Sequence, residues 1–258
     1  MHDLLIFVFV GFVAQMVDGA LGMAYGVISS TVLLAFGVPP ALASASVHAA
    51  EVFTTAASAG SHSISRNVNW KLFAPLAIGG CIGGAIGAYV LTSMDGTLLK
   101  PYITAYLALM GVVIIYRASR IMKQRPFPLK WSGPLGLLGG FIDAVGGGGW
   151  GPTVNSAMVG SGADPRMSIG TTNTAEFFVT ATISATFLAA LLTGHWVVPG
   201  GVATHAWAIV GLVIGGLVAA PLAGFAVKIA PARVLTYAVG ILVLLLASYQ
   251  TARLLGYL

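Results

Sequence analysis

The sequence predicts an all-α integral membrane protein made of two inverted repeats, with discontinuous or re-entrant helices. Its 258 residues are 57% hydrophobic and 7% charged, with a mean hydropathy of +0.93, whereas a soluble domain has about 25% charged residues. Apolar stretches leave room for roughly eight to ten membrane segments. The two halves also repeat one pattern of acids, glycines and prolines. This composition excludes a cytosolic enzyme, a nucleic-acid binder and a disordered chain.

The first half begins with an interrupted apolar segment. Leu4–Val17 is too short to cross a membrane alone, Asp18–Gly22 breaks it, and Met23–Phe36 continues it. Three further helices are expected at Ala41–Gly60, Phe73–Met94 and Tyr102–Tyr116. Arg117–Lys130 holds five Lys/Arg and no acid. We expect the first repeat to be residues 1–117 and a basic cytoplasmic linker to be residues 118–131.

The second half, residues 132–258, is expected to follow the same plan. Gly133–Ile142 leads to a break at Asp143–Gly149, and Trp150–Gly160 follows it. The remaining helices are expected at Met167–Thr193, Thr204–Val227 and Val234–Ala252.

A shift of 125 residues places Gly11–Gly60 on Gly136–Ala185 without a gap. The aligned identities include two acidic pairs, Asp18 with Asp143 and Glu51 with Glu176. Aligned apolar residues mean little in a membrane protein, but matched acids, glycines and prolines in one frame indicate a duplication.

Loop charges predict the orientation, because cytoplasmic loops carry an excess of Lys and Arg. An odd number of crossings in each half puts ten basic residues inside and two, Lys100 and Arg253, outside. The ten are Arg66, Lys71, the five linker residues, Arg166, Lys228 and Arg233. An even number gives eight against four. The odd count is favoured; it inverts the second repeat and places both termini outside, as in many secondary transporters.

Several classes of chemistry lack their signatures. A single cysteine, Cys81, excludes an internal disulfide and a cysteine-based metal cluster. The sequence contains no His-Glu-x-x-His, Gly-x-Ser-x-Gly or nucleotide-binding motif. We therefore predict no enzyme activity, no cofactor and no metal. Met1-His2-Asp3 has no basic n-region, so no cleaved signal peptide is expected.

The two breaks are the candidate anion site. A helix that starts inside the membrane directs free N–H groups and the positive end of its dipole at a ligand, and glycines let the backbone approach it. The predicted substrate-binding residues are Gly22, Tyr25, Ser46, His48, Gly146, Gly147, Gly148, Gly149, Trp150, Thr171, Thr172 and Asn173. Asp18 and Asp143 are predicted to cap the half-helices. The alternative is a pair of tight turns without a ligand.

Glu51 and Glu176 are predicted to couple transport to protons. Both lie well inside apolar segments, where an acid costs roughly 2.5–3.5 kcal/mol. Desolvation favours the protonated form of a carboxyl, and a protonated carboxyl would not repel an anion. His48 precedes Glu51 by three residues and shares its helix face. The alternative is a hydrogen bond that holds two helices together.

The glycine-rich block Phe141–Pro152, its echo Asp18–Gly26 and the element Gly170–Asn173 resemble the TauE/SafE (sulfite-exporter-like) family of membrane transporters. The resemblance covers essentially the whole chain. It implies a multi-pass carrier in the inner cell membrane that moves a small sulfur-containing anion, generally outward.

The predicted function is therefore a secondary transporter of sulfite or an organosulfonate such as sulfoacetate, acting as an exporter with proton coupling. A passive anion channel, or an uptake carrier for thiosulfate or another small anion, stays open as an alternative. The expected partners are the anion, protons and membrane lipids, and no nucleic acid. Whether the protein forms a homodimer is left open.

Overall fold

The computed structural model describes residues 2–119, 125–198, 201, 206–229 and 232–257. Every regular element among them is helical. The elements are α1 (His2–Leu21), α2 (Tyr25–Ala35), α3 (Pro40–Ile64), α4 (Trp70–Ser93), α5 (Gly96–Ala118), the short 3-10 turn η1 (Leu129–Trp131), α6 (Ser132–Gly146), the π-helical turn η2 (Gly151–Asn155), α7 (Ser156–Gly160), α8 (Pro165–Leu192), α9 (Ala206–Ile229) and α10 (Ala232–Leu254).

Within the residues that the structure describes, four helical segments are long and apolar enough to cross a membrane: Trp70–Ser93, Leu98–Tyr116, Pro165–Leu192 and Thr236–Leu254. Shorter apolar segments occur in α1, α2 and α9. Large apolar side chains stay exposed along the outer helices, among them Phe9, Ile78 and Leu245, as a lipid-facing surface requires. The predicted all-α membrane fold is confirmed.

The helix breaks are shorter than predicted. α1 continues through Asp18 to Leu21, and α6 continues through Asp143 to Gly146. The breaks predicted to begin at the two aspartates are therefore wrong in their starting points. The turn comes at glycine, because Gly22 (φ 64°) and Gly147 (φ 70°) adopt the left-handed conformation that ends a helix.

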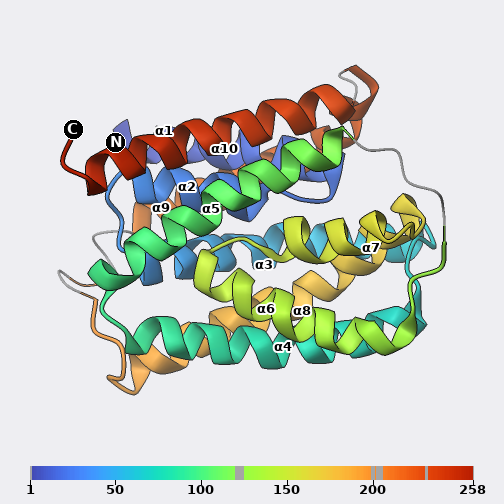
Figure 1. Cartoon of the computed structure of the whole chain (residues 1–258), viewed down its shortest axis with the longest axis horizontal. Coiled ribbons are helices and arrows are strands. Elements are labelled where there is room, and N and C mark those ends of the chain that lie inside the picture. Colours follow the sequence, from blue (N-terminus) through green and yellow to red (C-terminus); the bar gives the residue numbers. More distant parts are fainter. Residues whose placement is uncertain (1, 120–124, 199–200, 202–205, 230–231, 258) are drawn as a thin grey trace.

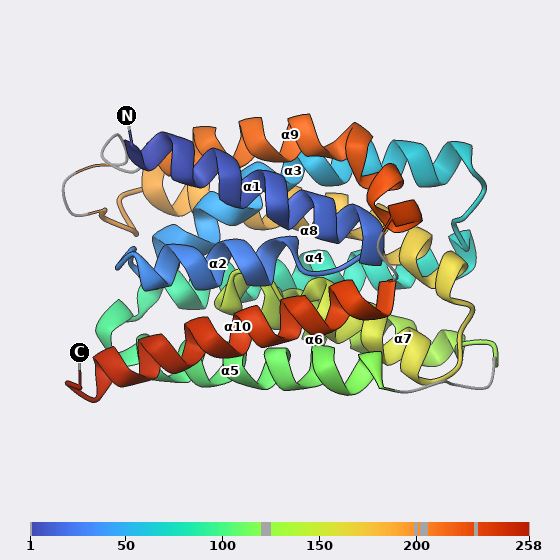
Figure 2. The ribbon, with the colours of Figure 1, turned by 90° about the horizontal axis from the view of Figure 1, so that it is seen from above.

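Each break reverses the direction of the chain. α1 runs inward from the end of the bundle that holds the N-terminus, and α2 returns toward that end (Figure 2). In the second half, α6 enters from the opposite end and η2 with α7 turns back toward it (Figure 1). Of the two predicted forms, discontinuous or re-entrant, the structure has the re-entrant one.

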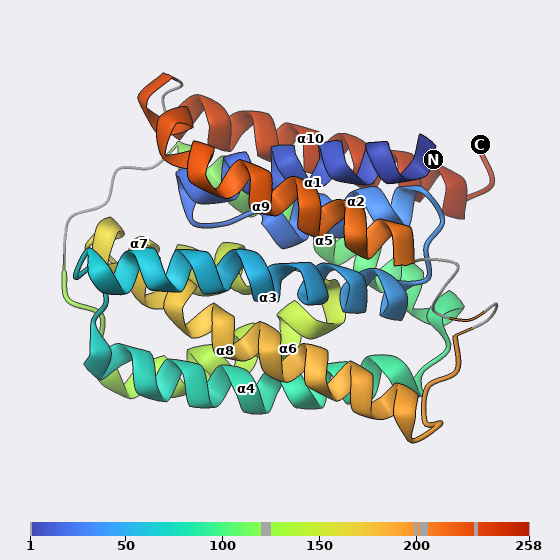
Figure 3. The ribbon, with the colours of Figure 1, turned by 180° about the vertical axis from the view of Figure 1, so that it is seen from behind.

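The halves pack in an exchanged order. α3 and α8 cross in the middle (Figure 3), α9 packs on α3 and α4 packs on α8. Outside them, α1 lies along α9 and α6 lies along α4, while α5 pairs with α10. The series α1–α9–α3–α8–α4–α6 therefore reads the same from either end when each helix is replaced by its counterpart in the other half.

Closely packed glycines follow the same exchange. Gly11 on α1 lies against the backbone of Leu212 on α9, and Gly136 on α6 lies against the backbone of Leu76 on α4. A Cβ atom at either glycine would overlap the facing carbonyl group. Small residues let helix backbones approach closely in membranes, so these contacts allow the outer helices to pair closely.

The two termini lie at one end of the bundle, and the chain around the linker lies at the other (Figure 1). Three basic residues lie at the linker end and donate hydrogen bonds there. Arg166 donates to Asn67 Oδ1 and Arg233 to Ala118 O from their side chains, and Arg125 donates to Gly162 O from its backbone amide. Lys100 and Arg253 line one pocket at the end that holds the termini. This grouping of basic residues is the one expected when each half crosses the membrane an odd number of times. The inverted-repeat relation and the division at residues 117 and 131 stay predictions.

Candidate functional site

The two breaks meet inside the bundle. Gly26 at the start of α2 packs against Gly147 and Gly148 of the second break, and Gly151 at the start of η2 packs reciprocally against Gly22 and Met23 of the first. Asn155 Nδ2 donates to Gly22 O at 3.1 Å, which ties the two loops together. Two chain segments more than a hundred residues apart thus form one contact.

The backbones of the two breaks touch at this contact. A Cβ atom built on Gly26 would overlap Gly148 Cα, and one built on Gly148 would overlap the Gly26 backbone. Not even a methyl group fits between these two glycines, so the backbones of the two breaks are in direct contact at this point. An anion that bound here would have to separate the two loops.

Asp143 closes the second break from the last turn of α6. Its Oδ1 accepts hydrogen bonds from the backbone amides of Gly149 at 2.5 Å and Trp150 at 2.9 Å. Asp18 reaches across the first break in the same way, and its Oδ1 accepts from the Tyr25 amide at 3.3 Å. Each carboxylate therefore occupies the amides that would otherwise be free to bind an oxyanion.

His48 joins α3 to this loop. Its side chain is fully buried, and Nε2 lies 3.2 Å from Asp143 Oδ2. On the other side of the ring, Nδ1 lies 2.8 Å from Ser44 O and 3.2 Å from Ser44 Oγ. The ring is thus held at both nitrogens, and the contact at Nε2 is to the capping carboxyl.

Four of the chain's seven acidic residues gather around the breaks: Asp18, Glu51, Asp143 and Glu176. Glu51 Oε1 faces Gly26, and Glu51 Oε2 is buried without a hydrogen-bond partner among the described residues. Glu51 and Glu176 each interact electrostatically with Asp18 and Asp143. None of the buried side chains that the structure describes is a Lys or Arg.

Several predicted site residues use their polar groups within the protein. Ser46 Oγ donates to Leu42 O, Thr171 Oγ1 to Met167 O and Thr172 Oγ1 to Ile169 O, each within its own helix. Asn173 Nδ2 donates to Ser58 Oγ at 3.1 Å. These four side chains lie in the central helices but do not contribute a free donor to the breaks.

The aromatic residues that follow the breaks have structural hydrogen bonds. Trp150 is 1% exposed and its Nε1 donates to Thr172 O at 3.0 Å, while Tyr25 is 2% exposed and its hydroxyl donates to Leu212 O at 3.0 Å. Each ring anchors its half-helix to a neighbouring long helix. Gly146 lies beside the break, with the ring of Tyr106 against its backbone.

The sequence did not single out Ser44 and Tyr106. Ser44 Oγ donates to Ala144 O at 2.6 Å and so links α3 to α6. The Tyr106 hydroxyl lies where a Cβ of Gly149 would be, so only glycine fits there. Ser44 precedes His48 by one helical turn, which is a usable signal. Tyr106 sits in an apolar helix and nothing in the sequence marks it.

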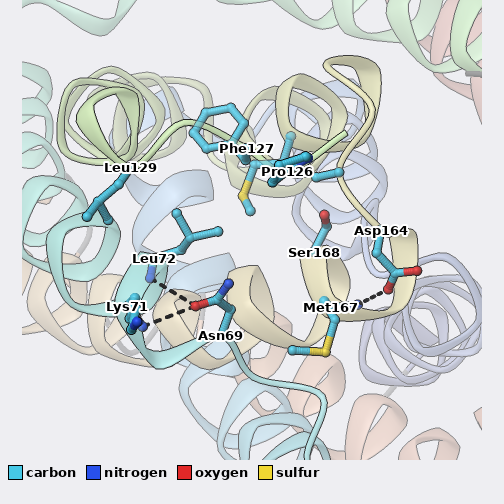
Figure 4. Close-up of a pocket in the computed structure, with 11 residues that line it drawn as sticks. Asn69, Lys71, Leu72, Pro126, Phe127, Leu129, Asp164, Met167 and Ser168 are labelled. Carbon is cyan, nitrogen blue, oxygen red and sulfur yellow. Dashed lines mark hydrogen bonds between the residues drawn. The ribbon is translucent and has the colours of Figure 1, made fainter. Parts of the chain in front are cut away.

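A separate pocket of about 330 Å³ opens at the linker end (Figure 4). Asn69 and Asp164 lie at its rim, where each caps a helix, and Phe127 and Met167 belong to its largely apolar wall. Ser168 Oγ, at its inner side, has no hydrogen-bond partner among the described residues. None of the predicted site residues lines this pocket.

Comparisons with known proteins identify the family of the chain. The family "Sulfite exporter TauE/SafE" matches residues 7–250, nearly the whole chain. The chain belongs to the TauE/SafE family. It is also 41% identical over 237 residues to the probable membrane transporter protein YtnM of Bacillus subtilis (strain 168), an alignment that covers 88% of this chain and 76% of that protein. No solved structure matches it.

Membership of TauE/SafE and the apolar helices make the chain a multi-pass membrane protein that acts in membrane transport. The predicted family is confirmed. The roles of the individual site residues stay predictions.

Proposed function

We propose that this TauE/SafE protein is a secondary transporter in the inner cell membrane that carries a small sulfur-containing anion, sulfite or an organosulfonate such as sulfoacetate. The observation that carries the proposal is the contact between two re-entrant breaks, each with its helix N-terminus capped by an aspartate. An anion that replaces a carboxylate at these amides takes over interactions that already suit a negative charge.

The acids around the breaks support proton coupling. Four acidic side chains and one imidazole lie in the same region, and none of the buried side chains that the structure describes is a Lys or Arg. Four ionised acids and an added anion would repel one another strongly in a poorly solvated interior. Protonation of Glu51 and Glu176 removes that repulsion, so binding of the anion and of protons would favour each other.

The direction of transport then depends on the gradients. If one proton moves with each singly charged anion, no net charge crosses the membrane, and a pH difference of one unit balances about a tenfold anion gradient. An anion that accumulates in the cell beyond this ratio moves outward, and one that is scarce inside moves inward. Export of a metabolic product such as sulfite fits the first condition.

Counterflow into proteoliposomes tests the substrate. Purified protein is reconstituted with unlabelled sulfite, sulfoacetate, thiosulfate, taurine or sulfate inside, and entry of the same labelled compound is measured. We expect exchange of sulfite or sulfoacetate well above that of sulfate and of protein-free vesicles. Exchange of none of the sulfur compounds would contradict the proposal.

The same vesicles separate a carrier from a passive channel. A carrier accelerates entry of label when unlabelled anion is present on the other side, because the loaded site returns faster. A channel lets label equilibrate without exceeding the outside concentration. In a carrier, the concentration of label inside transiently exceeds the concentration outside. If it does not, the result favours the channel.

A further inference from the structure

The hydrogen bonds of His48 fix where its first proton lies. Nδ1 has two neighbours, Ser44 O at 2.8 Å and Ser44 Oγ at 3.2 Å. A carbonyl oxygen only accepts, and the Ser44 hydroxyl gives its own proton to Ala144 O at 2.6 Å. Both neighbours are therefore acceptors, so Nδ1 must carry a hydrogen.

A second proton must then lie between His48 and Asp143. In a neutral imidazole with hydrogen on Nδ1, Nε2 has only a lone pair. That nitrogen lies 3.2 Å from Asp143 Oδ2, and an ionised carboxylate also only accepts. The contact becomes a hydrogen bond when one more proton is present, on Nε2 or on Oδ2.

The backbone favours the ionic form of the pair. Asp143 Oδ1 accepts two amide hydrogen bonds, from Gly149 at 2.5 Å and Trp150 at 2.9 Å. Hydrogen bonds of this kind stabilise a carboxylate over a carboxylic acid. The proton therefore resides on His48, as an imidazolium beside a carboxylate, and the pair is neutral overall.

The matching positions in the opposite halves, Asn173 and Asp18, do not form such a pair. Asn173 is the counterpart of His48, and its side chain donates to Ser58 Oγ rather than to Asp18. Asp18, the counterpart of Asp143, accepts from the Tyr25 amide. The two breaks are alike in backbone, but only one of them holds a histidine proton.

The remaining titratable groups near the pair are acids and phenols. Glu51 on α3 and Glu176 on α8 both interact electrostatically with Asp143, and so does Tyr106 on α5. Asp18 on α1 and Tyr25 on α2 interact with Glu51 in turn. Among the described buried side chains no other group can be positively charged, so His48 is the local source of positive charge.

We propose that the His48–Asp143 pair is a proton site of the transport cycle. At rest it holds one shared proton. When an anion replaces the Asp143 carboxylate at the amides of Gly149 and Trp150, the carboxylate takes up one further proton, and His48 Nε2–H turns to the anion. This inference rests on the proposed function, and it adds the site that binds the coupling proton and the number of protons that this site takes up with each anion.

The charges balance in this exchange. The resting pair is one imidazolium and one carboxylate, with no net charge. A singly charged anion such as hydrogensulfite leaves an excess of one negative charge, and one proton bound to Asp143 removes it. A doubly charged anion such as sulfoacetate requires a second proton, for which Glu51 is a candidate because it interacts electrostatically with Asp143. The products are an imidazolium bonded to the anion and a neutral carboxylic acid that no longer competes for the amides.

Nitrogen NMR of the histidine rings tests the resting state without any transport assay. Protein labelled with ¹⁵N-histidine is studied in detergent near neutral pH, and the ring of His48 is assigned from the signals lost in His48→Asn. We expect both nitrogens of His48 to carry hydrogen in the wild type, and only Nδ1 to do so in Asp143→Asn.

A neutral His48 in the wild type would overturn the proposal, as would a ring left unchanged by Asp143→Asn. If that variant fails to fold, the wild-type spectrum decides alone. Hydrogen on both ring nitrogens supports an imidazolium at His48 beside the Asp143 carboxylate, and hydrogen on only one nitrogen overturns it.

Transport tests the coupling separately. Accumulation of labelled sulfoacetate or sulfite driven by a pH gradient is compared in the wild type, His48→Asn and His62→Asn. His48→Asn places at position 48 the residue type that its counterpart in the second half, Asn173, already has. His62 lies on the same helix near its surface end, where it contacts Asn67.

We expect His48→Asn to lose pH-driven accumulation down to the level that the anion gradient alone sustains, while His62→Asn keeps it. If His48→Asn keeps the pH drive, the pair is not a coupling site, although the proposed function stands. If the wild type moves no sulfur anion at all, the proposed function fails, and the NMR result still decides the resting proton.

Discussion

Asp143 has two separate partners, and this distinguishes it from an ordinary helix cap. One oxygen holds the amides of Gly149 and Trp150, and the other lies against His48. Asp164, by contrast, caps α8 through a single bond to the Met167 amide in an exposed position. The two aspartates form a matched pair of a buried and a surface cap.

Asp143→Asn should lower the free energy of unfolding by about 1 kcal/mol or more, since it removes the charge that holds two buried amides and faces His48. Asp164→Asn should have a smaller effect, because its bond is exposed to water. Thermal unfolding in detergent measures both. Equal losses for the two variants would contradict the role given to the buried cap.

Glu51→Gln and Glu176→Gln should imitate the protonated acids. Exchange of anion for anion should persist while its dependence on pH flattens, because the replaced group no longer has to bind a proton before the anion enters. Counterflow measured across a range of pH values checks this. Two variants with the wild-type pH profile would make these carboxylates structural.

The sequence predicted which acids belong to the site but could not predict their contacts. Matched positions in the two halves identify Asp18, Asp143, Glu51 and Glu176 from the alignment alone. The bond from His48 to Asp143 joins residues 95 positions apart, and only the packing of α3 on α6 creates it. Thr171 and Thr172 were predicted as donors, but their hydroxyls bond carbonyls of their own helix, as such groups commonly do.

At the scale of elements, the contact between the breaks depends on glycine at the start of α2. Gly26 packs on the Gly148 backbone, whereas Gly60, near the end of α3, has no neighbour within 4 Å of the place where a Cβ would lie. Both residues are helical, so the same substitution, glycine to alanine, can be compared at a tightly packed position and at an open one.

Gly26→Ala should force the two loops apart and lower both stability and transport, because the added methyl overlaps backbone that cannot yield easily. Gly60→Ala should be neutral or stabilise the protein by up to about 1 kcal/mol through helix propensity. Unfolding temperature and counterflow rate check the pair. A tolerated Gly26→Ala would show that the loops are not tightly packed.

The positions of the breaks were only approximately predictable. Glycine-rich stretches marked them correctly, but an acid in an apolar segment does not by itself end a helix, and α1 and α6 run on past their aspartates. Helix ends follow from the positive φ of Gly22 and Gly147. The reversal of direction at each break depends on tertiary packing, for which a single sequence holds no local signal.

At the scale of the whole molecule, the basic residues divide between the two ends of the bundle. At the linker end lie Arg66 just after α3, Lys71 in α4, Arg125, Lys130 in η1, Arg166 in α8 and Arg233 in α10, and Lys100 and Arg253 lie at the other end. Lys228 and the linker residues Arg117, Arg120 and Lys123 lie outside the side chains that the structure describes. The positive-inside rule assigns the linker end to the cytoplasm.

Labelling of single cysteines tests this topology. In a Cys81→Ser background, Lys130→Cys places a thiol at the linker end and Tyr257→Cys places one at the end that holds the termini; both positions are exposed. We expect a membrane-impermeant maleimide to label Tyr257→Cys from outside, and Lys130→Cys only after the membrane is opened. The reverse pattern would invert the orientation.

The central claim is that this TauE/SafE protein couples movement of a sulfur anion to protons, and the most direct test is accumulation against a gradient. Proteoliposomes start with equal concentrations of labelled sulfoacetate, or of sulfite, on both sides and a pH that is lower outside. The account predicts that the anion accumulates inside, that an uncoupler which collapses the pH gradient abolishes this, and that Glu51→Gln or Glu176→Gln prevents it. Concentrations that stay equal on both sides, while counterflow of the same anion proceeds, would contradict proton coupling.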